Sequence, residues 1–441
     1  MYIMISKKAK LGTEPYKGVR DFYPEDMFIQ NHIQAIWRKT AESYGYEEFG
    51  ASILEPSELY RSKTSEEIVN EQTYSFLDRG DREVTLRPEM TPTIARMVAA
   101  KKQELIFPLR WFSIPNLFRY EKPQRGRLRE HWQFNADIFG ADGKESDLEI
   151  ISLARQTLLN FGAKENDFEI KINNRKIMSY ILRSIFELDE DNARRVSRLI
   201  DKKEKMSDKE FSDEAQNIFG ARTSQFIHVL ESKDLDTVTM NIRKGDEEIV
   251  GIVEIRELLE ALKEMGVTNA FFSPTLMRGF DYYTGMVFEI YDKDSANKRA
   301  LFGGGRYDDL LTVFGEERIR AAGFGMGDVT ARDFIETHGL LPEYAPACDL
   351  YIASIGQEQK GPIRSLSEDL RQKGLRVVSD VSDKRIQDKL KKADRKKYPF
   401  VLIVGADEVK TGKYKIKNMK TGEEIECRNE EIADKLLVDS Q

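Results

Sequence analysis

The sequence predicts an α+β fold, in which an antiparallel sheet is flanked by helices, interrupted by a helical insertion and followed by a smaller α/β domain. Three observations predict it. Short aromatic or β-branched runs are separated by Gly-Asp or Pro turns, as in antiparallel strands. The stretch 175–263 is charged and helical, with few strand signals. Beyond residue 348, strand and helix patterns alternate, which is typical of an α/β domain.

The elements of the first part follow from local periodicity. A helix is predicted over 26–44, where Phe28, Ile33 and Trp37 fall at helical spacing before Gly45. A second helix over 147–160 is expected to pack on the sheet, and a third covers 329–337. The strand patterns of this part occupy 74–77, 83–86, 109–120, 271–291 and 299–327.

The last part begins after a proline-bearing linker. We place the first domain at 1–340, with its insertion at 175–263, the linker at 341–347 and the last domain at 348–441. Strands are expected at 349–355, 375–379 and 400–404, and helices at 365–372 and 384–397. The last of these helices falls in a basic segment with eight Lys or Arg residues, which is either an RNA-binding surface or a solvated lysine face.

Composition limits the function classes. The chain has 441 residues, which predicts about three domains. It is 40% hydrophobic and 33% charged, ordinary for a globular protein. A net charge of −7 argues against nucleic-acid binding over the whole surface, so such contact must be local. Cys348 and Cys427 match no metal-ligand spacing. The first ten residues do not have the pattern of a signal peptide. No apolar run approaches the ~20 residues that a membrane-spanning helix needs. We therefore expect a cytoplasmic protein that does not enter a membrane.

The most informative segment is 118–140. Its first half carries five basic residues: Arg119, Lys122, Arg125, Arg127 and Arg129. Pro123 and Gly126 predict a turn among them, and guanidinium groups bind phosphate bidentately, so this half is interpreted as an anion-binding loop. A solvated basic hairpin is the alternative for this half taken alone.

The second half of that segment alternates apolar and polar residues. The polar positions Gln133, Asn135 and Asp137 would share one face of a strand. Burying them is costly without a ligand or partner, and a carboxylate favours a cationic or N–H-bearing ligand. This face therefore supports a binding site for a small polar ligand.

Three further segments can contribute to a site. Glu89 precedes a helix start and can receive an ammonium group, while Thr91 is also explained as an N-cap. The segment 277–285 offers Arg278, Tyr282 and Tyr283, although each tyrosine fits a strand core equally well. The glycine-rich segments around 303–305 and 323–327 indicate closely packed backbone near a ligand.

Taken together, these motifs resemble those of the histidyl-tRNA synthetases, a class II aminoacyl-tRNA synthetase family. The resemblance covers nearly the whole chain. The elements that carry it occur in the family's order: Thr85–Glu89, Phe118–Glu121 with the Pro-Gln-Arg-Gly-Arg loop, Arg278–Tyr283, Gly304–Asp308 and Gly323–Gly327. Jointly they are far more specific than any one of them.

The resemblance implies a fold and an activity. The fold is a class II catalytic domain with an antiparallel sheet, a helical insertion and a C-terminal α/β anticodon-binding domain, normally in a homodimer. The activity is that of a histidine–tRNA ligase: L-histidine is activated with ATP, whose phosphates carry Mg²⁺, and histidine is transferred from the histidyl-adenylate to the 3′ end of tRNA(His). No protein-bound metal is expected.

The resemblance also implies residue roles. The histidine-binding residues would be Glu89, Thr91 and Gln133 for the α-amino group, and Asp137, Tyr282 and Tyr283 for the imidazole. The ATP-binding residues would be Arg119, Glu121, Arg127 and Arg278. Of these, Arg119 grips the α-phosphate and Arg278 stabilises charge as the carboxylate attacks, so both are the expected catalytic residues. Gln124 and Arg125 would meet the tRNA acceptor end.

Three positions depart from the family pattern. Thr330 stands where motif 3 usually has an arginine for the ATP γ-phosphate, and Arg332 cannot substitute because two helical residues turn a side chain by ~200°. Either another cation such as Arg127 compensates or ATP use is altered. Ser52 stands at the proline of motif 1, and Asp137 replaces a longer glutamate. The alternatives to a ligase are a histidine-sensing regulatory subunit of ATP phosphoribosyltransferase and an RNA-binding sensor.

Overall fold

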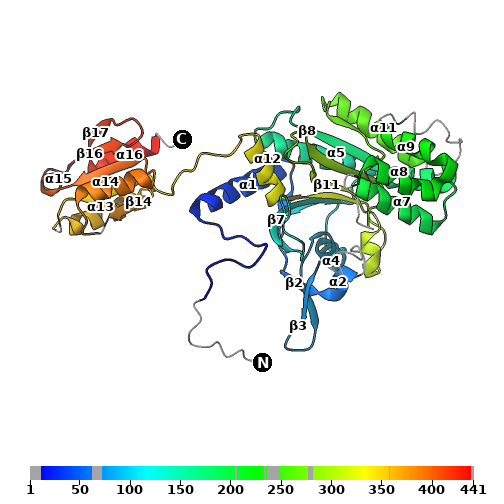
Figure 1. The fold of residues 1–441 in the computed structure, drawn as a ribbon. Coiled ribbons are helices and arrows are strands. Elements are labelled where there is room, and N and C mark those ends of the chain that lie inside the picture. The colour runs from blue at the N-terminus through cyan, green and yellow to red at the C-terminus, as the bar shows by residue number, and fades with distance from the viewer. Residues whose placement is uncertain are drawn as a thin grey trace. The chain divides into compact units, whose positions relative to one another are not determined.

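The computed structural model of this chain describes residues 11–61, 72–203, 206–232, 235, 249–276, 282–356, 358–380 and 382–438. The chain divides into two compact units, Met1–Pro342 and Glu343–Gln441, coloured blue to yellow and yellow to red in Figure 1. No helix among the described residues is long and apolar enough to cross a membrane.

The first unit is built on a large antiparallel-rich sheet. Its strand order is β1-β5-β7-β12-β11-β10-β8-β9, with β6 paired to β7. Only the outer pairs β1 with β5 and β8 with β9 are parallel among these strands. The strands are β1 (Glu47–Glu48), β5 (Leu109–Ser113), β6 (Asn116–Phe118), β7 (Glu130–Phe139), β8 (Phe168–Asn174), β9 (Ala270–Phe272), β10 (Met286–Asp292), β11 (Ala300–Arg306) and β12 (Ala321–Gly327). The predicted α+β class is confirmed.

Helices cover one face of this sheet (Figure 1). They are α1 (Pro24–Ser43), α5 (Gly143–Asn160), α11 (Ile249–Glu264) and α12 (Asp328–Thr337). Helix α5 lies against β7, β11 and β12, and α11 lies against β8, β9 and β10. Trp37 of α1 stacks on Phe134 of β7 at 5.8 Å between ring centroids. Burial of this apolar face leaves the opposite face of the central strands for other chemistry.

The segment predicted as a helical insertion is helical where it is described. Its elements are α6 (Arg175–Tyr180), a π-helical turn (Ile181–Ile185), α7 (Glu190–Lys202), α8 (Asp208–Phe219), a 3₁₀ turn (Gly220–Arg222) and α9 (Thr223–Glu231), followed by α11. An aromatic cluster holds them together, with Phe219 stacked on Phe226 at 4.0 Å and Phe186 edge-on to both. The insertion therefore has an apolar core of its own, continuous with the core of the sheet.

A smaller three-stranded sheet lies beside the large one. It has the order β2-β4-β3, with β2 (Leu54–Pro56), β3 (Tyr74–Leu77) and β4 (Glu83–Leu86), and it accompanies α2 (Ser57–Arg61) and α4 (Thr91–Lys101). A 3₁₀ turn (Leu310–Phe314) packs on α4. Because α4 follows β4 directly, the first turn of α4 is fixed close to the sheet.

Several predicted boundaries are corrected by the structure. The stretch 109–120 forms two strands, because the chain breaks at Ile114 and Pro115 before β6. Helix α5 begins at Gly143, four residues early, where Asp142 accepts a hydrogen bond from the Gly143 backbone N–H. Thr91 is not an N-cap: Met90 is, and no side chain caps α4. The Thr91 hydroxyl is therefore not committed to the helix end.

The second unit is a small α/β structure. Its sheet has the order β14-β13-β15-β16-β17, with β14, β13 and β15 parallel and the last two pairs antiparallel. The elements are β13 (Leu350–Ser354), α13 (Lys360–Gln372), β14 (Val377–Asp380), α14 (Ile386–Arg395), β15 (Phe400–Val404), α15 (Ala406–Thr411), β16 (Lys413–Asn418), β17 (Glu424–Arg428) and α16 (Asn429–Val438). Both cysteines are free and buried.

The basic helix of the second unit, α14, is not uniformly solvated. Lys389 is 2% exposed and donates hydrogen bonds to the Ser354 hydroxyl and carbonyl at 2.9 and 3.1 Å. Lys392 pairs with Asp380 at 3.0 Å. Two of its lysines therefore hold the helix to the sheet, and a phosphate-binding surface must use the others.

Candidate functional site

The site lies on the sheet face opposite to α1, α5, α11 and α12, beside α4, and β7 provides its central side chains. Phe134, Ala136 and Ile138 point into the core and are at most 1% exposed. Gln133, Asn135 and Asp137 point to the other face, as the alternation predicts.

The neighbouring strand β12 makes room for them, because it pairs Gly323 with Asp137 and Gly325 with Asn135. A Cβ at Gly323 would lie 2.4 Å from an Asp137 carboxylate oxygen, and a Cβ at Gly325 would lie 2.4 Å from the Gln133 amide nitrogen. Any larger residue at Gly323 or Gly325 would clash with the β7 side chains that lie over these two positions, so both positions require glycine.

A pocket of about 100 Å³ forms around these polar groups. At ~10–15 Å³ per water it has room for several waters or one small polar molecule. It is lined by the six residues predicted to bind histidine and by the predicted phosphate ligand: Glu89, Thr91, Gln133, Asp137, Tyr282, Tyr283 and Arg119. Segments separated by about two hundred positions in the sequence thus meet in one cavity.

The pocket also includes residues that sequence analysis did not assign. Tyr307 follows β11 and donates its hydroxyl to the Asp137 carboxylate. Asn135 accepts a hydrogen bond from the Gln133 amide at 2.7 Å. The alternation of β7 places Asn135 on the polar face but gives it no role, and Tyr307 lies in the Gly-Gly-Arg-Tyr-Asp motif, but that motif does not indicate which of its side chains faces Asp137.

Asp137 has a strongly perturbed acidity in this pocket. Burial raises its pKa to about 7, and the Tyr307 hydrogen bond lowers it only in part. Burial together with the Asp137 carboxylate keeps the Tyr307 pKa well above its usual value, so Tyr307 stays protonated and donates. An N–H donor or a cation entering the pocket would stabilise the charged carboxylate.

A second buried carboxylate lines the same pocket. Glu89 is 3% exposed and accepts a hydrogen bond from the Tyr282 hydroxyl at 3.2 Å. Tyr282, Tyr283 and Tyr307 form a ring cluster with centroids 4.9 to 6.3 Å apart. The cavity therefore has two buried carboxylates and aromatic walls, which suits a small ligand with two separated N–H or cationic groups.

A larger pocket of about 1130 Å³ adjoins the small one and shares Arg119, Gln133 and Gly325 with it. Seven Lys or Arg residues and four acidic residues line it, so it favours an anion. Arg119 donates its Nε hydrogen to the Pro88 carbonyl at 2.9 Å, which aims the guanidinium at the junction of the two pockets. His131 also lines it, and burial lowers its pKa to about 3, so this imidazole is neutral.

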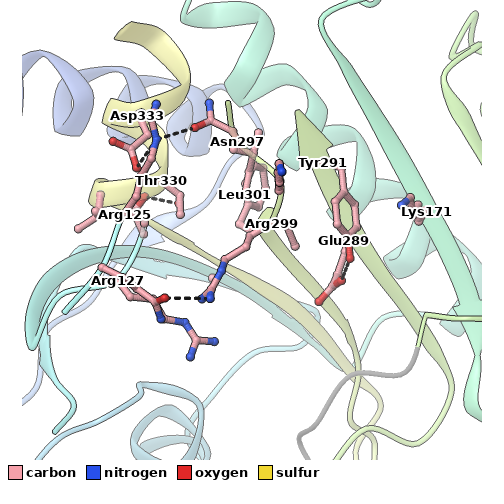
Figure 2. A pocket seen from close by; sticks show the side chains of 18 of the residues that line it. Arg125, Arg127, Lys171, Glu289, Tyr291, Asn297, Arg299, Leu301, Thr330 and Asp333 are labelled. Carbon is pink, nitrogen blue, oxygen red and sulfur yellow. Dashed lines mark hydrogen bonds and ion pairs between the residues drawn. The ribbon is translucent and has the colours of Figure 1, made fainter. Parts of the chain in front are cut away.

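The basic loop forms a tight hairpin at the rim of this pocket. Gln124 and Arg127 pair across Gly126, which has a φ of 75°. Figure 2 shows Arg125 beside Asp333 and Thr330, with Arg299 reaching toward the hairpin from the start of β11. Arg125 donates to the Asn297 side chain at 3.2 Å, while Gln124 accepts a hydrogen bond from Arg299 at 3.0 Å.

One of the five loop basic residues is not available to an anion. Arg129 is 9% exposed, donates to the Glu121 carbonyl at 3.1 Å and lies over the Tyr120 ring at 4.1 Å. It also donates to the Tyr16 hydroxyl at 3.1 Å, so it fixes the N-terminal segment against the loop. Interpretation of Arg129 as part of an anion-binding loop is therefore wrong, because the run of charge does not reveal which member is buried.

Two other positions that depart from the family pattern, Thr330 and Ser52, and the nearby Arg332 lie in different environments. Thr330 lines the large pocket, and its hydroxyl donates to the Gly327 carbonyl at 3.1 Å. Arg332 pairs with Asp26 of α1 at 2.8 Å and is not part of the lining, as its helical phase predicts. The Ser52 hydroxyl accepts a hydrogen bond from the Leu54 backbone at 3.2 Å, close to the smaller sheet.

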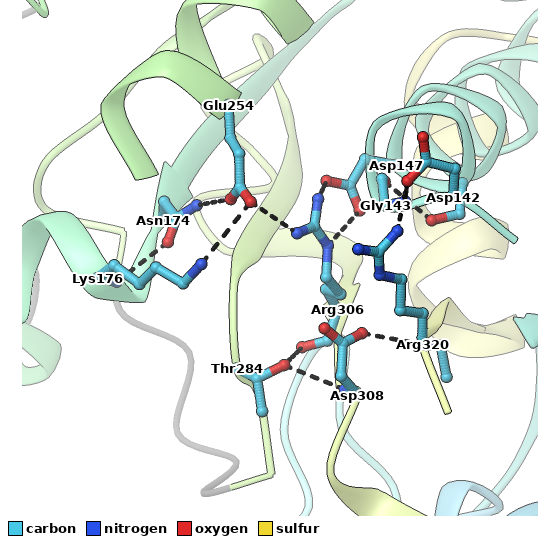
Figure 3. A network of polar contacts seen from close by, with 12 residues as sticks. Asp142, Gly143, Asp147, Asn174, Lys176, Glu254, Thr284, Arg306, Asp308 and Arg320 are labelled. Atoms are coloured by element: carbon cyan, nitrogen blue, oxygen red, sulfur yellow. Dashed lines mark hydrogen bonds and ion pairs between the residues drawn. The ribbon is translucent and has the colours of Figure 1, made fainter. Parts of the chain in front are cut away.

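A polar network supports the site from behind (Figure 3). Arg306, next to Tyr307, is 6% exposed and donates to Asp147 of α5 and Glu254 of α11. Burial alone would lower the Arg306 pKa, but these two carboxylates raise it, so the guanidinium is charged. The last helix of the insertion is thus connected to the strand end that carries Tyr307.

Arg278 lies outside the described residues. Among the described residues no cluster of three or more His, Cys, Asp or Glu side chains could hold a metal ion.

Comparison with known proteins agrees with this geometry. A sequence model of histidyl-tRNA synthetase matches residues 18–328, and a model of the anticodon-binding domain matches residues 349–438. The chain belongs to the histidyl-tRNA synthetase family. A histidine–tRNA ligase of Leptospira biflexa is 41% identical over 94% of each chain. One from Thermoplasma volcanium is 38% identical over 93% of this chain and 95% of the relative.

Solved structures show the same fold. The histidyl-tRNA synthetase of Nostoc sp. PCC 7120 matches 98% of this chain and all of its own at a TM-score of 0.81 and 20% identity. A Bacillus halodurans protein described as an ATP phosphoribosyltransferase regulatory subunit/histidyl-tRNA synthetase matches 90% of this chain at a TM-score of 0.75 and 24% identity. Both likenesses concern the fold, which ligases and regulatory subunits can share.

Proposed function

We propose that this chain is a histidine–tRNA ligase that activates L-histidine with ATP and transfers it to the 3′ end of tRNA(His). The observation that carries the proposal is that the six residues expected to bind histidine line one small pocket with Arg119 at its opening. That opening leads into a large pocket with an excess of basic residues. An amino acid and a nucleotide would therefore meet at Arg119.

The roles of the small pocket follow from its two carboxylates. Glu89, Thr91 and Gln133 take the α-amino group of histidine, since a buried carboxylate and two polar groups match an ammonium ion. Asp137 and Tyr283 take the imidazole, with Tyr282 beside them. The Asp137 carboxylate accepts an imidazole N–H, which an amino acid with an apolar side chain cannot supply.

The large pocket holds ATP. Arg119 binds the α-phosphate, Glu121 binds the adenine and Arg127 also contacts the phosphates. Arg278 stabilises the charge that develops when the histidine carboxylate attacks the α-phosphorus. Mg²⁺ arrives bound to the ATP phosphates and neutralises the departing pyrophosphate. The protein thus contributes positioning and electrostatic stabilisation, and forms no covalent bond to the substrate.

The remaining assignments concern RNA and assembly. Gln124 and Arg125 on the hairpin meet the tRNA acceptor end, and 348–441 serves as the anticodon-binding domain after the 341–347 linker. The exposed basic residues of α14 contact RNA phosphates. The catalytic domain occupies 1–340 with its insertion at 175–263, and the enzyme works as a homodimer in the cytoplasm.

Histidine-dependent exchange of labelled pyrophosphate into ATP tests the proposal. We expect exchange with histidine and Mg²⁺, and at least ~100-fold slower exchange with other amino acids. Charging of tRNA(His) should follow in the complete reaction. If histidine binds by calorimetry but supports no exchange, the chain is a sensor, as a regulatory subunit would be. The match to an anticodon-binding domain over 349–438 favours the ligase over that alternative.

A further inference from the structure

The large pocket lacks a cation at the position where the family pattern expects one. Thr330 stands in the first turn of α12 with its hydroxyl on the Gly327 carbonyl, and its methyl carbon faces Gly126 of the hairpin. Asp333, one turn later, adds a negative charge to the same wall. The terminal phosphate of a nucleoside triphosphate in this pocket therefore needs a positively charged side chain from another element.

The three arginines beside this wall differ in their partners. Arg125 lies 4.0 Å from the Asp333 carboxylate, and Arg127 lies 3.4 Å from that of Glu121. Each of those carboxylates offsets part of the charge that the arginine presents to an incoming anion. Arg299 donates to the amide oxygen of Gln124, and within the described part of the chain it has no carboxylate within 4.0 Å. Its full charge faces the pocket.

The chain leading to Arg299 is held in place. Asn297, two residues earlier, is 9% exposed and donates to Asp292 at 2.7 Å and to Thr337 of α12 at 3.2 Å. The backbone N–H of Asp294 donates to the Asp292 carboxylate at 2.8 Å. Immediately after Arg299, β11 begins at Ala300, which pairs with Tyr291. The point from which the Arg299 side chain extends is therefore fixed on both sides, which reduces the ordering cost of binding.

We propose that Arg299 binds the terminal phosphate of ATP in place of the residue at position 330. A guanidinium can donate two parallel hydrogen bonds to a phosphate and remains charged at every working pH. Arg299 extends from the residue before β11 and Thr330 stands on α12, and both line the large pocket beside the hairpin (Figure 2). This inference deepens the proposed ligase activity and rests on it.

Exchange kinetics of Arg299→Ala provide the test. We expect the KM for ATP to rise about 10- to 100-fold, the range for loss of a charge-assisted contact, while the KM for histidine stays unchanged. Inhibition of exchange by AMP, which has no terminal phosphate, should also stay unchanged. Arg332→Ala is the matched control, because Arg332 is on α12 but pairs with Asp26 outside the pocket, and it should leave the ATP KM as it is.

A second variant tests whether the two positions are equivalent. Adding Thr330→Arg to Arg299→Ala should restore most of the ATP affinity. An unchanged ATP KM in Arg299→Ala, with active wild-type protein, overturns the inference and leaves the ligase proposal intact. If AMP inhibition and ATP binding are weakened equally, the inference is also overturned, because Arg299 would then shape the pocket without contacting the terminal phosphate. Absence of exchange in the wild type overturns the ligase proposal itself.

Discussion

The two adjoining pockets hold their polar groups in different ways. In the small pocket, Glu89 and Asp137 are 3% exposed and each accepts a hydrogen bond from a tyrosine hydroxyl. In the large pocket, the side chains of Arg125 and Arg127 are 58% and 50% exposed, and their carboxylate partners lie 3.4 to 4.0 Å away. Buried groups of the first kind cost ~1–3 kcal/mol each when left unsatisfied, whereas exposed pairs contribute ~0–1 kcal/mol.

This difference explains which part of the site tolerates change. A wrong ligand in the small pocket leaves a buried carboxylate unpaired, so discrimination between amino acids is strong there. The large pocket binds charge with solvated side chains that several elements can provide. The missing arginine at position 330 can be offset by Arg299 just before β11, whereas the Asp137 carboxylate is held inside the small pocket by the Tyr307 hydroxyl.

The largest effect is expected for Asp137→Asn. The amide keeps the size of the side chain but removes the charge that receives the imidazole, so kcat/KM for histidine in the exchange assay should fall by about 100-fold or more. The KM for ATP should change little. Asp333→Asn in the large pocket is the matched variant, and it should change either parameter by less than about fivefold. Equal losses in both variants would break the distinction between the pockets.

A smaller loss of histidine affinity is expected for Gly323→Ala. The new Cβ would stand 2.4 Å from both the Asp137 carboxylate and the Tyr307 hydroxyl, and the nearest backbone atom is at 2.7 Å, so these groups must move. We expect a ~10- to 100-fold rise in the KM for histidine with the ATP KM unchanged. Gly50→Ala, where a Cβ meets nothing within 4 Å, should behave as wild type. A normal histidine KM in Gly323→Ala would show that the pocket adjusts as easily as the large one.

Histidine affinity should also depend on pH through Asp137. Because burial raises its pKa to about 7, the empty pocket gains a proton below that value, and histidine must then bind a neutral carboxyl group. The KM for histidine should therefore rise by up to about tenfold per unit as pH falls from 7 to 5. Free histidine titrates in the same range, so Asp137→Asn is the reference: it keeps the substrate's titration and removes the protein's. Parallel pH profiles for the two proteins would contradict this assignment.

Much of this site follows from patterns that are local in the sequence. The period of two of a strand predicts the polar face of β7, and the turn of about 100° per residue of a helix predicts that Arg332 points away from Thr330. Those predictions need only the backbone geometry of one element. The family resemblance then assigned a ligand to that face.

The features that sequence analysis missed depend on contacts between distant segments. Tyr307 and Asp137 are 170 positions apart in the sequence, and β12 lies between the strands that carry them to each other. Arg129 belongs to a charged run but is buried against Tyr16, and Arg299 belongs to no motif and acquires its place from the turn at Asn297. The sequence shows which charged or polar side chains are present. Tertiary packing decides which of them are buried and which partners they contact.

The smallest expected effect is on stability, and it follows from the same buried carboxylate. Since burial raises the folded-state pKa of Asp137, its contribution to the free energy of unfolding is fully present below the unfolded value of about 3.9 and is lost as pH rises through about 7. Without histidine, Asp137→Asn should thus raise the melting temperature by about 1–3 °C at pH 8 and less at pH 5. Saturating histidine should reverse the order at pH 8, because only the wild-type carboxylate gains a partner. If Asp137→Asn instead lowers the melting temperature at pH 8 without histidine, the Asp137 carboxylate is already stabilised by the protein alone. The difference in tolerance between the small and the large pocket would then have to come from the glycines of β12 alone.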